Sequence, residues 1–120
     1  MSYSNPTTIC YTIRAAAVDT GGTLDTIIGP SGMKGRVVDV GYVVTVDIVG
    51  AASSIIVGSS GDTNAYATAL SIPVSSAGAG GNGATLVADH EIVADTLVIV
   101  TTDNGATSGD ADLFVTIDWY

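Results

Sequence analysis

The sequence predicts an all-β protein, a jelly-roll-like antiparallel β-sandwich of about seven or eight strands. Three observations favour this fold: several segments alternate apolar and polar residues, the connections between them are rich in glycine, and no segment has apolar residues at helical spacing. The chain has 120 residues, which suits one domain with one core. We expect this domain to span residues 7–120, after an extended arm at residues 1–6.

The N-terminal arm is polar and closes with a proline, so it has no apolar face with which to fold alone. Tyr3 and Asn5 are its candidates for contact with a neighbouring subunit. From Thr7 to Ala17 every second residue is apolar, which predicts a strand with Cys10 on its more polar side. A glycine-rich turn and a short strand at Thr23–Ile28 follow.

The longest strand pattern runs from Gly35 to Val49. Its even positions from Val38 to Ile48 are apolar and predict a face toward the core, which we expect to pack against the apolar face of Leu113–Trp119. Its odd positions carry little charge and small side chains, so that face is a candidate contact surface for another subunit. The predicted core residues are Val38, Val40, Tyr42, Val44, Val46 and Ile48, and the predicted contact residues are Asp39, Gly41 and Thr45.

The second half of the chain is also strand-rich. Ser53–Gly58 is apolar and β-branched, a single helical turn is expected at Asp62, and residues 75–83 are predicted to be a flexible glycine-rich loop. The remaining predicted extended segments are Leu70–Val74, Thr85–Ala88, Glu91–Thr101 and Ala111–Tyr120.

The aromatic residues divide by the parity of their strands. Tyr42 and Trp119 fall on apolar faces and are expected in the core. Phe114 and Tyr120 share the more polar face of the last strand, which makes them candidates for a contact surface.

Charge excludes several partners. The formal net charge is −9 with only three basic residues. The protein therefore has almost no cations with which to bind nucleic acid or an anionic membrane surface. Charged residues make up 12% of the chain, about half of the usual share, and a surface this poor in charge suits packing against other subunits. The single cysteine allows no intramolecular disulfide, and the first residues lack the pattern of a signal peptide.

No residue pattern predicts catalysis, so we expect no enzyme, cofactor or metal. His90 lies between two acids and is expected in a solvated loop, because neighbouring strand residues point to opposite faces. Two groups of oxygen-bearing side chains leave loop-bound calcium open as an alternative, although turn formation is the commoner role of such residues. These are Asp62 with Asn64, and Asp103, Asn104, Asp110 and Asp112.

Four segments in this order carry a family resemblance: Lys34-Gly-Arg-Val-Val-Asp-Val-Gly-Tyr-Val-Val-Thr, Ile55-Ile-Val-Gly followed by Gly61-Asp-Thr-Asn-Ala-Tyr, Ala94-Asp-Thr-Leu-Val-Ile-Val, and Gly109-Asp-Ala-Asp-Leu-Phe-Val-Thr-Ile-Asp-Trp-Tyr. With them the chain resembles small β-rich virion proteins of tailed bacteriophages, the head decoration, cement or head fibre proteins.

The resemblance implies a homotrimer or dimer on the outer capsid surface. Such an oligomer would bridge subunits of the major capsid protein. We expect it to bind neither nucleic acid nor a membrane directly. The alternative is a head or tail fibre tip, or a carbohydrate-binding jelly-roll module.

Overall fold

The computed structural model describes residues 7–20, 22–87, 90–103 and 105–120. Tyr3 and Asn5 lie outside these described residues. The described residues form eight strands and contain no helix that is long and apolar enough to span a membrane. The strands are β1 (Thr7–Ala17), β2 (Gly22–Ile28), β3 (Gly35–Val49), β4 (Ser53–Gly58), β5 (Ala67–Ile72), β6 (Gly80–Asn82), β7 (Leu97–Thr102) and β8 (Ser108–Trp119).

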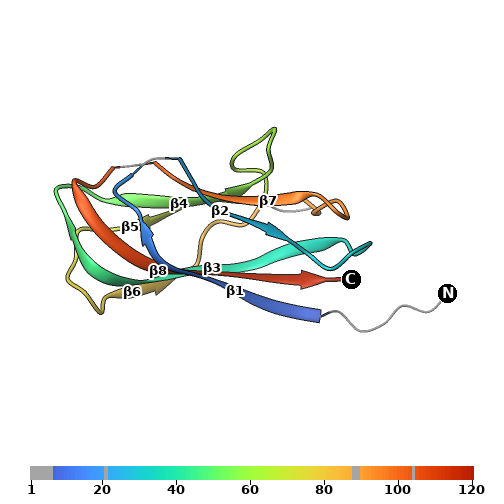
Figure 1. Cartoon of the computed structure of the whole chain (residues 1–120), viewed down its shortest axis with the longest axis horizontal. Helices are drawn as coiled ribbons and strands as arrows, with labels where there is room; N and C mark the ends of the chain where they lie inside the picture. Colours follow the sequence, from blue (N-terminus) through green and yellow to red (C-terminus); the bar gives the residue numbers. More distant parts are fainter. Residues whose placement is uncertain (1–6, 21, 88–89, 104) are drawn as a thin grey trace.

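The strands form two four-stranded sheets, β1-β8-β3-β6 and β2-β7-β4-β5, and all the strand pairs are antiparallel. The two sheets lie as two layers in Figure 1. The pairing is nested, since β1 pairs with β8, β2 with β7, β3 with β6 and β4 with β5. This strand order is that of an eight-stranded jelly roll, so the predicted fold is confirmed.

The core lies between the two layers and is almost entirely aliphatic. Tyr42 and Trp119 are buried there, as their strand parity predicts. Trp119 fits because two glycines leave room for its ring: a Cβ on Gly29 would lie 2.3 Å from the ring and one on Gly35 would lie 2.6 Å from it. The indole Nε1 donates a hydrogen bond to the hydroxyl of Tyr11 at 2.9 Å, which satisfies the one polar atom of this buried side chain.

Two residues of β3 that were predicted to face the core, Val38 and Val46, face solvent instead. Val38 is 37% and Val46 50% exposed, while Val37 is buried. The register of β3 against β8 shifts between Val37 and Asp39 and again on either side of Val46, and each shift moves the following residues to the other face. β3 and β8 are also neighbours in one sheet, so the predicted packing of their apolar faces across the sandwich is wrong as well.

Several predicted boundaries also differ. The loop predicted at residues 75–83 contains β6, which pairs with Gly41–Val43 of β3 through its backbone and carries no strand pattern in its side chains. At Asp62 the chain forms a turn rather than a helical turn. β7 begins at Leu97 because the chain turns just before it, where Thr96 N donates to Val93 O at 3.3 Å.

Candidate interaction face

The outward side of the β1-β8-β3-β6 sheet, here called the outer face, is centred on β8. The residues of this strand alternate between buried and half-buried, and the alternation directs every second side chain away from the core. The half-buried residues of β8 are Asp110, Asp112, Phe114, Thr116 and Asp118.

Three predicted contact residues come together on the outer face. Phe114 lies opposite Thr12 of β1 on one side and opposite Gly41 of β3 on the other. Asp39 lies two pairs further along, opposite Thr116, and accepts a hydrogen bond from the side-chain amide of Asn82 in β6 at 3.3 Å. Asp39, Gly41 and Phe114 therefore share one side of one sheet.

Gly41 itself is buried, because β6 passes close to it. A Cβ at this position would lie 3.1 Å from the carbonyl oxygen of Gly81 and 3.2 Å from Cβ of Asn82. The missing side chain lets β6 approach β3 and leaves the ring of Phe114 without a side-chain neighbour at that position of the register. Gly41 thus shapes the outer face without being exposed on it.

The other predicted contact residues do not join this group. Thr45 is exposed but falls in the register shift between Val44 and Val46, toward the far end of the β3–β8 pair. Tyr120 follows β8 at the near end, where its backbone exchanges two hydrogen bonds of 2.9 Å with Lys34. Tyr3 and Asn5 lie outside the described residues.

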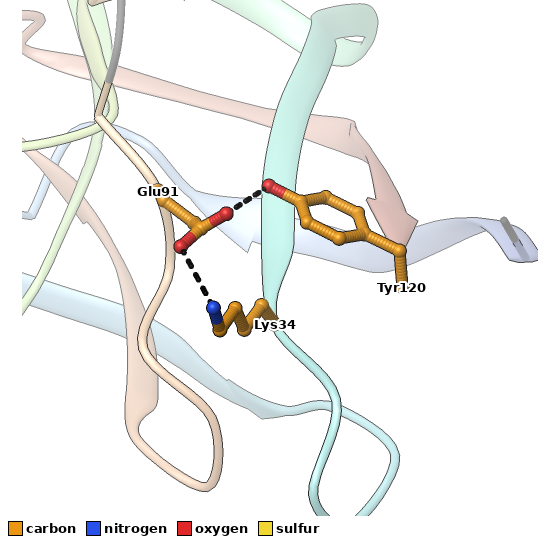
Figure 2. A network of polar contacts seen from close by, with 3 residues as sticks. All are labelled: Lys34, Glu91 and Tyr120. Carbon is orange, nitrogen blue, oxygen red and sulfur yellow. Dashed lines mark hydrogen bonds and ion pairs between the residues drawn. The ribbon is translucent and has the colours of Figure 1, made fainter. Parts of the chain in front are cut away.

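Tyr120 and four charged residues gather where β8 ends and β3 begins. This group is here called the polar end cluster: Lys34, Arg36, Glu91, Asp118 and Tyr120. Figure 2 shows its central contacts, in which the hydroxyl of Tyr120 donates to one oxygen of Glu91 while Lys34 Nζ lies 3.7 Å from the other. The hydrogen bond to Glu91, some burial and the negative charge of Glu91 together raise the pKa of Tyr120, and Arg36 opposes this. Arg36, Glu91, Asp118 and Tyr120 line a shallow hollow.

Sequence reasoning missed the polar end cluster. Glu91 reaches it because Ile92 exchanges two backbone hydrogen bonds with Gly35, which ties the segment before β7 to the start of β3. Nothing in the local sequence around Glu91 signals this long-range contact.

Two of the calcium candidates, Asp103 and Asp112, hold neighbouring backbone through hydrogen bonds. Asp103 Oδ1 accepts backbone hydrogen bonds of 3.1 Å from Ser54 and Gly105, and Asp112 Oδ1 accepts one of 2.8 Å from Ala15. Burial raises the pKa of Asp103, but the hydrogen bonds from Ser54, Gly105 and Ser53 together outweigh it and lower the pKa. Within residues 7–20, 22–87, 90–103 and 105–120, no three acidic, histidine or cysteine side chains gather as a metal site. Asn104 lies outside the described residues.

His90 is exposed and packs edge to face on the buried ring of Tyr66, with ring centroids 5.2 Å apart. Burial raises the pKa of Tyr66, against a smaller opposing effect of its hydrogen bond with Thr96. Among the described tyrosine, phenylalanine and tryptophan residues, Tyr120 alone is exposed, at 41%. The described part of the chain thus lacks the row of exposed rings on which a carbohydrate module stacks sugars.

Comparison with known proteins gives likenesses to solved structures alone, two of which are described here. No family model and no curated protein matches the chain. A chain of the capsid asymmetric unit of cyanophage Pam1 matches with a TM-score of 0.49 and 19% identity over 97% of this chain and 83% of that one. A chain of the disulfide-linked pili that form Bacillus endospore appendages matches with a TM-score of 0.43 and 19% identity over 100% and 93%. Likenesses of this size leave the function to be argued from the chain itself.

Proposed function

We propose that the protein is a non-enzymatic structural protein of a bacteriophage virion, which decorates the outside of the capsid and stabilises it by binding the major capsid protein. The resemblance of four sequence segments to head decoration and cement proteins gives the class of protein. The jelly roll agrees with the fold which that resemblance implies. No covalent chemistry is part of the proposal.

The observation that carries the proposal is the position of Phe114. It is an aromatic residue on the outer face, partly buried but still accessible, and is flanked by Thr12 and Gly41. Aromatic residues are enriched at interfaces, and a few anchors surrounded by nearly neutral contacts often supply most of the binding energy. We assign Phe114 the role of the anchor on the major capsid protein, with Asp39 and Thr116 beside it as polar contacts.

The mechanism is the sum of many weak contacts. One sheet face of this kind, with one aromatic anchor, gives modest affinity by itself. On an icosahedral shell, where an oligomer can engage several equivalent capsid subunits at once, the second contact becomes intramolecular and the overall affinity rises steeply. The bound protein would then link neighbouring capsid subunits and resist their separation.

The test is co-sedimentation of the purified protein with capsids of the same phage that lack it. We expect binding that saturates at a stoichiometry commensurate with the icosahedral lattice. Phe114→Ala should weaken binding at least tenfold, whereas Leu97→Ala, which removes a 42% exposed apolar side chain from the other sheet, should leave it unchanged. Absence of binding by the wild-type protein would refute the capsid role, and equal effects of the two variants would refute the assignment of the outer face.

A further inference from the structure

Each sheet of the sandwich has two edge strands, β1 and β6 in one and β2 and β5 in the other. An edge strand presents unpaired backbone N–H and C=O groups, and it can pair with a strand of another chain unless it is short, bulged, charged or covered. The four edges of this molecule differ in these respects.

Three of the edges are protected. β6 is only three residues long, Gly80–Asn82. β5 is covered at its start by a following segment, since Thr68 N donates to Thr85 O at 2.9 Å and Val87 N donates to Tyr66 O at 3.0 Å. β2 is interrupted by a register shift next to the exposed Asp25 and is followed by Gly29 and Pro30.

β1 has none of these protections between Thr7 and Ile13. Over these residues its register with β8 is continuous, and the shift that ends the regular stretch comes only after Ile13, near Ala15 with its positive φ of 49°. The stretch Thr-Thr-Ile-Cys-Tyr-Thr-Ile contains no charged residue, glycine or proline. In the sheet order of the described residues its one neighbour is β8, so its other side is open.

We propose that this open edge pairs antiparallel with β1 of a second copy of the chain, about a two-fold axis at Cys10. The side chains on either side of Cys10 are matched for such pairing, because Thr8 would face Thr12 and Ile9 would face Tyr11 of the other copy. Cross-strand pairs of two threonines, or of an aromatic and a β-branched residue, are among the favourable ones. The two β1-β8-β3-β6 sheets would join into one continuous sheet.

Self-complementarity favours a second copy as the occupant, because the pairs about Cys10 join the same stretch of both subunits. The chain has a formal net charge of −9, so two copies repel each other overall. Thr7–Ile13 carries no charge, so the contact itself adds no pair of like charges. A two-fold contact uses the same surface on both subunits and closes on itself, so it gives a dimer and not the trimer that the sequence resemblance also allows. This pairing does not depend on the capsid role.

Cys10 is exposed and provides a native reporter. At the two-fold axis the two Cys10 residues would face each other, and directly opposite residues of antiparallel strands have Cα atoms about 4.5–5.5 Å apart, within the range of a disulfide. Diamide should therefore oxidise the two thiols to one disulfide and give a covalent dimer. Diamide itself takes up the two electrons and two protons that the thiols lose.

The matched control is the double variant Cys10→Ser with Thr26→Cys, which moves the single cysteine to an exposed position on β2. We expect the wild type to be cross-linked at least tenfold faster than this control at the same protein concentration. Equal rates would mean that the wild-type cross-link arises from random collision, and they would overturn the proposal.

A charge-swap experiment tests the pairing without a disulfide. Cys10→Lys and Cys10→Asp each place two like charges opposite each other, so each variant alone should be monomeric by sedimentation equilibrium under conditions where the wild type dimerises. Mixing the two variants should restore a dimer containing one of each, and Thr26→Lys should dimerise like the wild type. A monomeric wild type at all accessible concentrations, or a Cys10→Lys variant that dimerises normally, would overturn the proposal. Capsid co-sedimentation tests the proposed function separately.

Discussion

Substitution of Gly29 by alanine tests how tightly Trp119 is packed in the core. The added Cβ would lie 2.3–2.5 Å from three carbons of the six-membered part of the indole, closer than side-chain carbons approach. The backbone of Gly29 is not in the positive φ region, so any L residue can adopt its conformation and the effect isolates the steric conflict.

The expected cost follows from the response of a packed core to an extra carbon. Overpacking a buried site destabilises a protein by about 1–3 kcal/mol. For a domain of this size, each kcal/mol corresponds to roughly 3–5 °C in Tm, so Gly29→Ala should lower Tm by about 3–15 °C. The assay is thermal unfolding followed by circular dichroism, with urea unfolding for the free energy.

Gly61→Ala is the matched control, because a Cβ there meets nothing within 4 Å and the backbone is again outside the positive φ region. It should be neutral or stabilise by up to about 1 kcal/mol, through a smaller entropy of the unfolded chain. Combining Gly29→Ala with Trp119→Phe should cost less than the sum of the two single changes, because the smaller ring relieves the conflict. Equal stability of Gly29→Ala and Gly61→Ala, or strict additivity in the double variant, would refute the reasoning.

Two further predictions concern titration. Glu91→Gln should lower the pKa of Tyr120, because it removes the carboxylate whose hydrogen bond and charge raise that pKa. Absorbance at 295 nm reports the tyrosine titration, and Tyr120→Phe assigns the signal to this residue. An unchanged titration in Glu91→Gln would contradict the contact. Asp103 has a pKa below its ordinary value of 3.8 in the folded state, so its stabilising effect is present above that value and is lost as the pH falls through the lowered folded-state pKa. Asp103→Asn should therefore show a weaker loss of stability on acidification in urea titrations, and parallel curves for variant and wild type would count against this role.

The fold class was predictable because strands buried on one face leave a clear pattern. In β8 the buried and half-buried residues alternate along the strand, which was predicted at Ala111–Tyr120 and is observed at Ser108–Trp119. β6 was not predictable, since Gly-Gly-Asn pairs only through its backbone and buries no apolar side chain. The parity of β3 failed at Val38 and Val46 because a bulge changes the face without changing the apolar pattern.

The site was predictable where it depends on one strand and not where it depends on a loop. Strand parity selected Phe114 and Asp39, and the register of β8 with β3 brings them to one face. The contact of Glu91 with Lys34 and Tyr120 depends on how the segment before β7 packs against the start of β3, which only the tertiary structure determines.

The nested pairing of the strands has a consequence for the folding pathway. The shortest chain closure joins β4 to β5, and the longest joins β1 to β8, between Thr7 and Trp119. Non-local pairing slows folding, and all-β domains of this kind fold in about milliseconds to seconds. Pairing can start at the β4–β5 hairpin and proceed outward through β3–β6 and β2–β7. At each step the strands already paired shorten the loop that must still be closed, whereas a direct encounter of β1 with β8 would close almost the whole chain at once. On this pathway the β1–β8 pair forms last, so β1 keeps both of its edges unpaired until the rest of the sandwich has formed and only then presents a single ordered edge to a partner.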